Sequence, residues 1–278
     1  MQNTKGKDQS QGANAQLVKQ QFGSSARAYA ECEVHRSGAS LDRLVELVAP
    51  QDDWTALDIA TGAGHTAAVF APHVAKVVAS DITEEMLAEA LELARERGLK
   101  NLSTEVANAE DLPFDDNSFD LVTCRLAAHH FPNPNRFVAE TSRVLRKGGT
   151  FALVDNIPPT PETTPGLTAS EEQAAAKTYN SFEKLRDPSH ARALSAAEWQ
   201  GLCEQNNLTF DSLEVIEKEM AFQPWVERMH CSEDTTEALR SQITTTGTVL
   251  NTFLKPRQID GELHFSLREA ILIAKKTG

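Results

Sequence analysis

Short runs of apolar residues alternate with amphipathic segments through the first half of the chain. The apolar runs predict strands at 54–60, 76–81, 102–108, 119–125 and 150–155. The segments between them have the apolar spacing of helices, at 66–74, 83–98 and 135–149. Strands that alternate with helices in this way predict an α/β fold, in which a doubly wound parallel sheet is covered by helices on both faces.

The regions on either side of this alternation have different patterns. Upstream, a polar start is followed by two predicted helices that end at Pro50. Downstream, a proline-rich loop leads to a predicted helix at 167–187. Ser195 and Glu198 then form a capping box that opens another helix. The remaining segments predict a long strand, a polar helical stretch and a closing strand, at 208–222, 224–254 and 268–276.

The charge balance of the chain argues against a nucleic-acid partner. The sequence has 27 Lys and Arg against 40 Asp and Glu, a net charge of −13, and no basic run concentrates the cations. We therefore expect a small-molecule ligand. The N-terminus lacks the apolar stretch of a secretory signal, and no window is apolar enough to span a membrane, so the sequence predicts a cytoplasmic protein.

The four cysteines are scattered, at positions 32, 124, 203 and 231. None forms a CxxC pair, so the sequence predicts neither a zinc site nor a disulfide framework, and we expect no metal ion.

The stretch LDIATGAGHTA, residues 57–67, carries the main chemical signal. Gly62 and Gly64 have no Cβ, so backbone N–H groups can approach a ligand, and a helix begins near His65. Two cofactor classes fit. A GxGxxG/A pattern followed by Asp81, 19 residues after Gly62, is typical of dinucleotide binding. Asp58, however, would repel a pyrophosphate and attract a cationic ligand, which favours S-adenosylmethionine.

Four stretches in order resemble a known family: LDIATGAGHTA, VVASDITEEML, ANAEDLPFDDNSFDLVTCRLAAHHF and ETSRVLRKGGTFALVD. Together, over residues 54–156, they resemble the class I S-adenosylmethionine-dependent methyltransferases with a type 11 domain. Within these, the ubiquinone/menaquinone-biosynthesis C-methyltransferases are the most similar. The resemblance implies a Rossmann-like, doubly wound seven-stranded sheet whose last strand is antiparallel. The chain departs from the family at Ala60, where Gly is usual, and we expect the added Cβ to narrow the loop slightly.

The resemblance also implies a division of the chain into five parts. These are a disordered polar N-terminus (1–15), an N-terminal helical cover (16–50), the S-adenosylmethionine-binding core (51–156), a lid insertion (157–194), and the rest of the sheet with a helical substrate-side insertion (195–278). Closure of the cover and the insertions would exclude water from the site.

The resemblance assigns the cofactor to the ends of the first two strands. After the first strand, the implied binding residues are Asp58, Ala60, Thr61, Gly62, Gly64 and His65. After the second strand, Asp81 would bind the two ribose hydroxyls through charge-assisted hydrogen bonds. Ile82 would lie against the adenine, and Met86 also belongs to the implied cofactor set. An alternative for Asp81 is a helix N-cap.

The next two strand ends complete the implied cofactor set. Asn108, Ala109 and Glu110 would frame the adenine edge, although Glu110 could instead cap a short helix. Cys124 and Arg125 would lie beside the methionine part of the cofactor. Alternatives for Arg125 are a substrate anion and a salt bridge with Glu110.

A catalytic base is needed only if the methyl acceptor must lose a proton. The primary candidates are His130, His35 and Tyr29, followed by Asp155 and His190. His129 is a neighbour of His130, and we expect at most one of the two to face the substrate.

The leading hypothesis is therefore an S-adenosylmethionine-dependent methyltransferase that acts on a small molecule, with a ring carbon of a quinone-like or aromatic compound as first candidate. O-, N- or S-methylation of another metabolite is an alternative. An NAD(P)-binding oxidoreductase, a non-catalytic cofactor-binding partner and, because of the four cysteines, an arsenic methyltransferase are others. The acceptor and the oligomeric state stay open, with a homodimer as one option.

Overall fold

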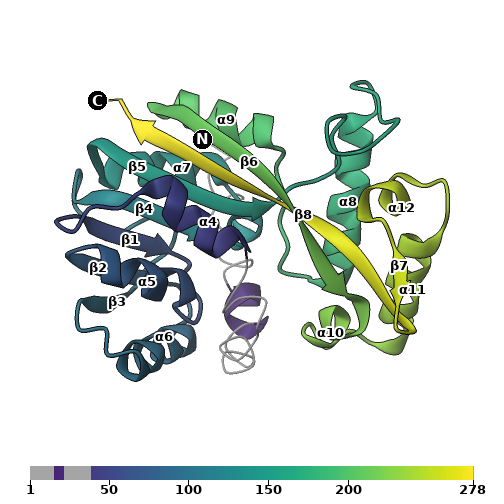
Figure 1. The fold of residues 1–278 in the computed structure, drawn as a ribbon, viewed down its shortest axis with the longest axis horizontal. Coiled ribbons are helices and arrows are strands. Elements are labelled where there is room, and N and C mark those ends of the chain that lie inside the picture. Colours follow the sequence, from purple (N-terminus) through teal and green to yellow (C-terminus); the bar gives the residue numbers. More distant parts are fainter. Residues whose placement is uncertain (1–15, 22–38, 278) are drawn as a thin grey trace, which may run out of the picture.

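A single mixed sheet of eight strands forms the framework of the molecule (Figure 1). The computed structural model describes residues 16–21 and 39–277. The strand order is β3-β2-β1-β4-β5-β8-β6, with β7 paired to β8. The strands are β1 (Thr55–Ile59), β2 (Lys76–Asp81), β3 (Leu102–Val106), β4 (Phe119–Arg125), β5 (Leu145–Asn156), β6 (Leu208–Ala221), β7 (Arg257–Ile259) and β8 (Glu262–Lys276).

The sheet confirms the predicted doubly wound topology. β1 to β5 pair in parallel, whereas the closing strand β8 runs antiparallel to both β5 and β6. The short strand β7 was not predicted. It precedes β8 in a tight hairpin, and its turn residues Asp260 and Gly261 both have positive φ, as an Asp-Gly hairpin turn requires. β8 accordingly begins six residues before the predicted 268–276 segment.

Helices cover both faces of the sheet. The α-helices in the described ranges, apart from residues 16–21, are α4 (Ala39–Val48), α5 (His65–Phe70), α6 (Glu84–Glu96), α7 (Pro134–Val144), α8 (Glu172–Arg186), α9 (Ala196–Gln205), α10 (Phe222–Glu227), α11 (Glu233–Thr244) and α12 (Val249–Leu254). Two 3-10 turns are η1 (Ala71–His73) and η2 (Ala128–His130). None of these helices is long and apolar enough to cross a membrane, a finding that applies to the described residues.

Two predicted helix ends were wrong, and one predicted cap is confirmed. The helix at 135–149 ends at Val144, because Gly148 and Gly149 favour extended or left-handed backbone and β5 already begins at Leu145. The helix at 66–74 ends at Phe70, where Pro72 enforces a 3-10 turn. At α9 both hydrogen bonds of the predicted capping box are present.

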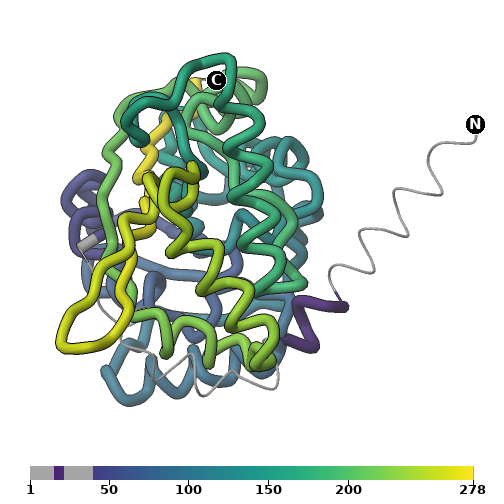
Figure 2. Tube along the Cα trace, turned by 90° about the vertical axis from the view of Figure 1, so that its right-hand side faces the viewer, coloured from purple at the N-terminus to yellow at the C-terminus, as the bar shows by residue number. Residues whose placement is uncertain are grey.

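The hydrophobic core has three parts. One lies under α4 and α5 and includes Leu44 and Phe70, and another lies under α7 and α9 and includes Phe137 and Trp199. The third belongs to a separate group of helices, α8, α10, α11 and α12, which packs around aromatic residues such as Trp225. We call this group, with the distal ends of β6 and β8, the helical lobe (Figures 1 and 2).

The strands β6 and β8 connect the two halves of the molecule. Both begin or end in the main sheet and extend into the helical lobe, where β8 pairs with β7 (Figure 1). The helix at residues 16–21 lies between the sheet and the lobe in this view. The two halves therefore leave a cavity at the carboxyl ends of the parallel strands, which is where α/β sheets bind ligands.

Candidate active site

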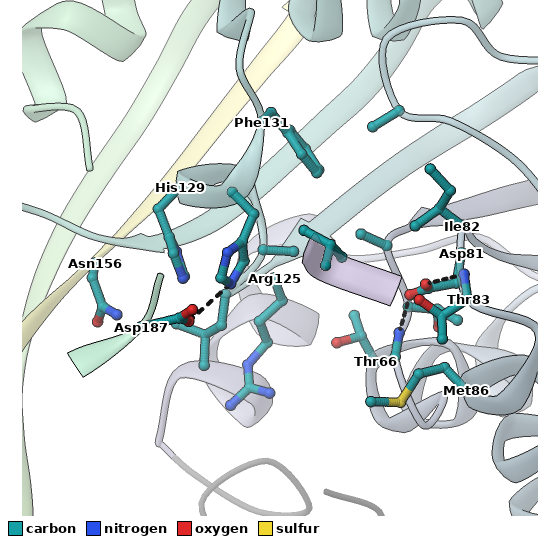
Figure 3. Close-up of a pocket in the computed structure, with 18 of the residues that line it drawn as sticks. Thr66, Asp81, Ile82, Thr83, Met86, Arg125, His129, Phe131, Asn156 and Asp187 are labelled. Atoms are coloured by element: carbon teal, nitrogen blue, oxygen red, sulfur yellow. Dashed lines mark hydrogen bonds and ion pairs between the residues drawn. The ribbon is translucent and has the colours of Figure 1, made fainter. Parts of the chain in front are cut away.

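A cavity of about 230 Å³ lies between the strand ends and the helical lobe. Its cofactor side, as we name it here, is made by the loops after β1, β2 and β3, at residues 60–66, 81–86 and 107–110. Its acceptor side is made by η2, the end of α8, and parts of β6, α10 and β8. In Figure 3, Asp81, Ile82 and Met86 lie on one side, His129, Asn156 and Asp187 on the other, and Arg125 between them.

The loop after β1 alternates left-handed residues. Ala60, Gly62 and Gly64 have φ values of 51°, 55° and 84°. A Cβ on Gly62 would meet nothing within 4 Å, so this glycine leaves space beside the cavity. A Cβ on Gly64 would lie only 2.7 Å from the Cβ of Ala90 in α6. Gly64 therefore serves helix packing and does not line the cavity, which corrects its expected place beside the ligand.

Asp81 lies at the end of β2 with its carboxylate held by two backbone groups. Gly62 N–H donates to Oδ2 and Thr83 N–H donates to Oδ1, each at 2.9 Å (Figure 3). Burial raises the pKa of the Asp81 carboxyl, and these backbone hydrogen bonds oppose the rise. The N-cap of α6 is Thr83, so Asp81 is not the cap that the alternative required. Two carboxylate oxygens have about four acceptor sites, which leaves capacity for a diol.

Asp58 lies behind the cavity wall rather than in it. Its side chain is 2% exposed, and it accepts hydrogen bonds from the hydroxyls of Thr61 at 2.5 Å and Thr123 at 2.6 Å. Burial raises the pKa of Asp58 to about 6. Asp58 thus anchors the β1 loop through Thr61, which does line the cavity. Asp58 was expected to contact a cationic ligand directly. Its carboxylate instead holds the loop that lines the cavity.

Cys124 is also buried away from the cavity. It is 0% exposed and belongs to the core cluster that includes Phe137 and Trp199, and it does not line the cavity. Cys203 is likewise buried in this core and Cys231 lies in the helical lobe. These three thiols do not converge, which removes the support for arsenic chemistry from the described cysteines.

The loop after β3 places its three predicted residues at the cavity. Asn108 Oδ1 accepts from the N–H of Glu110 at 3.0 Å, and Glu110 Oε1 accepts from the N–H of Asn133 at 2.7 Å. Asn133 is the N-cap of α7, so Glu110 ties this loop to that helix while also lining the cavity. Ala109 also lines the cavity. The chain makes a turn at Glu110 and no helix begins there, so Glu110 does not cap the short helix that the alternative required.

The remaining cofactor-side predictions also line the cavity. They are Ala60, His65, Ile82, Met86 and Arg125. Burial lowers the pKa of the Arg125 guanidinium, while Glu269 and Asp58 oppose the change. Arg125 Nη2 lies 3.5 Å from the hydroxyl of Ser40 in α4.

On the acceptor side, His129 forms a pair with Asp155. Its Nδ1 lies 2.6 Å from Asp155 Oδ1, and the two side chains are 13% and 1% exposed. Burial acts to lower the pKa of His129, but the carboxylate of Asp155 outweighs burial, so the pKa is raised. Because a carboxylate only accepts, the neutral ring carries its proton on Nδ1 and keeps a lone pair on Nε2.

His130 has a different environment although it follows His129 directly. Its Nδ1 lies 3.1 Å from the Ser189 hydroxyl, and its Nε2 lies 3.9 Å from Asp187 Oδ2. Burial, followed by the neighbouring His129, lowers the pKa of His130 to about 4. Both residues line the cavity, with ring centroids 4.2 Å apart, and the expectation that at most one of them faces the substrate stays a prediction.

The other candidate bases have separate positions. His190 is 3% exposed behind His129, with its Nε2 2.8 Å from Asn180 Oδ1, and burial lowers its pKa to about 2. It does not line the cavity. His35 and Tyr29 lie outside the described residues.

Several charged side chains of the acceptor side were not predicted as site residues. Arg186 ends α8, Lys218 lies on β6, Arg228 follows α10 and Glu269 lies on β8. They come together only through the β6–β8 pairing and the packing of the helical lobe. The local signal was weak, such as the charged pair Arg268 and Glu269 at the start of the otherwise apolar stretch REAILIA. Within the described ranges, no group of three or more His, Cys, Asp or Glu is arranged to hold a metal ion.

Comparison with known proteins identifies the family. Residues 57–153 match the methyltransferase domain family. The uncharacterized methyltransferase YcgJ of Bacillus subtilis (strain 168) is 35% identical over 207 residues, which cover 74% of this chain and 78% of that protein. The crystal structure of BH2331 from Bacillus halodurans C-125 superposes with a TM-score of 0.78 at 36% identity, over 87% of this chain and 100% of that one.

A third relative matches over a shorter region. The ubiquinone/menaquinone biosynthesis C-methyltransferase UbiE of Brucella canis (strain ATCC 23365 / NCTC 10854 / RM-666) is 38% identical over 120 residues, 41% of this chain and 45% of that protein. The chain belongs to the class I S-adenosylmethionine-dependent methyltransferases. It is a methyltransferase enzyme and its cofactor is S-adenosylmethionine, which decides against the nicotinamide alternative and against a non-catalytic role.

The residues at the cofactor side fit this cofactor. Gly62 leaves open space at the cavity, Asp81 retains acceptor capacity for a diol, and Ile82 and Met86 supply apolar surface. No dedicated cationic group lies among residues 60–66, 81–86 and 107–110 except His65, so a diphosphate has little to bind there.

Proposed function

We propose that this enzyme methylates a small aromatic or quinone-like molecule that carries an ionisable hydroxyl group. The observation that supports this proposal is the buried pair His129–Asp155 at the acceptor side of the cavity. A base is superfluous for an acceptor that already offers a lone pair, such as a thiolate or a neutral amine, but a phenol or a hydroquinone must lose a proton to become nucleophilic. We therefore infer that the pair serves such an acceptor.

His129 and Asp155 have different roles in removing the proton. Asp155 accepts from Nδ1–H, which fixes the ring and stabilises its charged form. His129 then takes the hydroxyl proton of the acceptor on Nε2. The raised pKa makes His129 the stronger base of the two histidines, whereas the lowered pKa of His130 makes it a weak base. The geometry thus favours His129 over His130 for the role.

The cofactor side positions the reaction partner. Bound S-adenosylmethionine supplies an electrophilic methyl group on a positively charged sulfur. Asp81 would hold the ribose hydroxyls, Asn108, Ala109 and Ile82 would surround the adenine, and Gly62 would allow close approach of the backbone. Asp58 would not contact the cofactor but would position Thr61, whose hydroxyl donates to its carboxylate. Such positioning of two bound reactants contributes on the order of 7–11 kcal/mol to a group transfer.

The site of methylation on the acceptor is proposed as a ring carbon. An ionised phenol is nucleophilic at oxygen and at the ortho and para carbons. The partial match to UbiE, a C-methyltransferase, favours carbon, although that match covers only 41% of this chain. Oxygen is the second candidate, because the same base activates it.

Product analysis tests this proposal. The purified enzyme is incubated with methyl-labelled S-adenosylmethionine and parallel sets of hydroquinones, phenols, amines and thiols. We expect label in the hydroxylated aromatic set alone, on a ring carbon by NMR. Label on oxygen would show that the enzyme is an O-methyltransferase. Label only in amines or thiols would contradict the role of His129 as a base.

A further inference from the structure

One face of the strands β5, β8 and β6 forms part of the cavity wall. Asn156 of β5 and Glu269 of β8 are paired directly across the ladder, so their side chains lie on the same face. Lys218 of β6 is paired with Leu267, two residues before Glu269, and therefore belongs to this face as well. Asn156, Lys218 and Glu269 all line the cavity, and we call them the polar triad.

Glu269 uses one of its two carboxylate oxygens. The residue is 1% exposed, and its Oε1 lies 2.6 Å from Lys218 Nζ. Its Oε2 is buried and accepts no hydrogen bond from any residue that the structure describes. A buried carboxylate oxygen without a donor is unfavourable, and nearly all such atoms in folded proteins have a partner. Because Glu269 lines a ligand cavity, a bound molecule can supply the missing donor.

The other two members of the polar triad also have unused hydrogen-bonding capacity. Asn156 Oδ1 is buried and has no donor among the described residues. Asn156 lies on the same side of the cavity as His129 (Figure 3). The ammonium group of a lysine has three donors, and of those of Lys218 the described part of the chain takes one, through Glu269. The triad therefore offers acceptor oxygens and ammonium donors at one place.

A hydroxyl group matches this combination better than a charged group does. A hydroxyl both donates and accepts, so it can donate to Glu269 Oε2 or Asn156 Oδ1 and accept from Lys218. An ammonium group only donates and would meet the like charge of Lys218. A carboxylate only accepts and would meet the like charge of Glu269. The ion pair is neutral as a whole, so the triad favours a neutral group that has both functions.

We propose that the polar triad binds a second hydroxyl group of the methyl acceptor, separate from the hydroxyl that His129 deprotonates. This inference rests on the proposed function, because it concerns the acceptor of that reaction. It narrows the acceptor from phenols in general to molecules with at least two hydroxyl groups, and it makes Glu269 a specificity-determining residue. Met220 and Leu267, on the same face of the sheet, would contact the apolar part of the molecule.

A binding experiment tests the inference without turnover. The enzyme is saturated with S-adenosylhomocysteine, and calorimetry measures the affinities of catechol, resorcinol and hydroquinone and of the matching 2-, 3- and 4-methylphenols. Within each pair a methyl group replaces one hydroxyl, and the three pairs differ in the distance between the two groups. A site that hydrogen-bonds a hydroxyl rejects the analogue without it, because its buried polar groups stay unpaired. We expect at least one diol to bind about ten-fold or more tightly than its methylphenol.

Variants locate the effect. K218M/E269L replaces both charged partners with apolar side chains, leaves no unpaired charge and should abolish the preference for the diol. E269Q keeps the shape of the side chain without its charge and should keep only part of the preference. E92L/R95M removes an exposed ion pair of α6 and is the matched control, with no change expected. Unchanged S-adenosylhomocysteine affinity and melting temperature show that the variants are folded.

Two outcomes would overturn the inference while leaving the proposed function intact. One is equal affinity for each diol and its methylphenol, which would mean that water and not the acceptor serves Glu269. The other is a preference for a diol that persists in K218M/E269L, which would place the second hydroxyl elsewhere. If none of the six phenols bound to the enzyme loaded with S-adenosylhomocysteine, the proposed function itself would fail.

Discussion

The two sides of the cavity are built by different means. The cofactor side consists of three loops, each directly after a parallel strand, and it presents mostly backbone, small residues and the two carboxylates of Asp81 and Glu110. The acceptor side is assembled from η2, α8, β6, α10 and β8, and it presents charged side chains and aromatic surface. The first is part of the sheet and suits one constant ligand. The second depends on the attached helical lobe, so it can differ between enzymes that share the sheet.

The largest expected effect comes from removing the proposed base, which should impair the acceptor side and leave cofactor binding intact. H129Q should lower turnover about 100-fold or more, as removal of a general base typically does, with little change in S-adenosylhomocysteine affinity. H130Q is the matched comparison and should lower turnover less than about ten-fold, because its low pKa makes it a poor base. Steady-state kinetics with an identified acceptor measure both. A larger loss in H130Q would return the role to His130.

The next prediction concerns the two glycines of the β1 loop. G64A forces a Cβ against Ala90 and should lower the free energy of unfolding by about 2–3 kcal/mol. G62A has open space and should lower it by only about 1 kcal/mol, the conformational term, but its methyl group enters the cavity and should weaken cofactor binding. Urea unfolding and calorimetry separate the two. Equal unfolding energies for both variants would contradict the assigned packing role of Gly64.

A substitution of Asp81 tests how much its carboxylate contributes to cofactor binding. D81A should weaken S-adenosylmethionine binding by about 2 kcal/mol or more, since two charge-assisted hydrogen bonds are lost. D111A removes an exposed carboxylate from the loop after β3 and serves as the control, with no change expected. Calorimetric titration of both variants checks this. Full affinity in D81A would mean that the carboxylate only organises Gly62 and Thr83.

The dependence of turnover on pH gives a further test. His129 acts as a base only when it is deprotonated, so turnover should rise with pH through a pKa above the usual value for histidine. D155N removes the carboxylate that raises this pKa, so the rise should move to lower pH while the plateau falls. The measurement is kcat against pH for both proteins. If the rise of kcat occurred at the same pH in D155N as in the wild type, a group other than His129 would be titrating.

The smallest effect is expected at Ala60. This residue has a φ of 51°, where a side chain costs roughly 1–2 kcal/mol and glycine does not. Because glycine also loses more entropy on folding, A60G should raise the unfolding free energy by no more than about 1 kcal/mol. Thermal unfolding measures this. A clear loss of stability would show that the Ala60 methyl group makes a packing contact of its own.

The cofactor side was largely predictable because its residues are close in sequence. The predicted Ala60, Gly62, Asp81, Ile82 and Asn108 all line the cavity, since each follows a strand that the pattern located correctly. The sequence did not show which residues of the motif line the cavity and which lie buried behind its wall. Asp58 and Gly64 belong to the same motif, yet they lie behind the wall, and only their packing against Thr123 and Ala90 reveals this.

The acceptor side could not be predicted in the same way, because its residues meet through register and lobe packing. Asn156 and Glu269 are paired residues of β5 and β8, and a shift of one residue would turn Glu269 away. The pair of His129 with Asp155 joins an η2 turn to the end of β5, which no local spacing indicates. Arg186 depends on where α8 ends against Trp225.

One consequence of the long β6–β8 pair concerns the mechanics of the molecule. Both strands pass from the main sheet into the helical lobe, and they are paired from Leu208↔Lys276 to Ala221↔His264 with one shift of register between Phe210 and Ser212. A two-stranded ribbon twists more easily than it stretches or breaks. We therefore expect any widening of the space between Asp81 and Arg186 to twist this ribbon, and the stiffness of the ribbon to limit how far the cavity opens when ligands exchange.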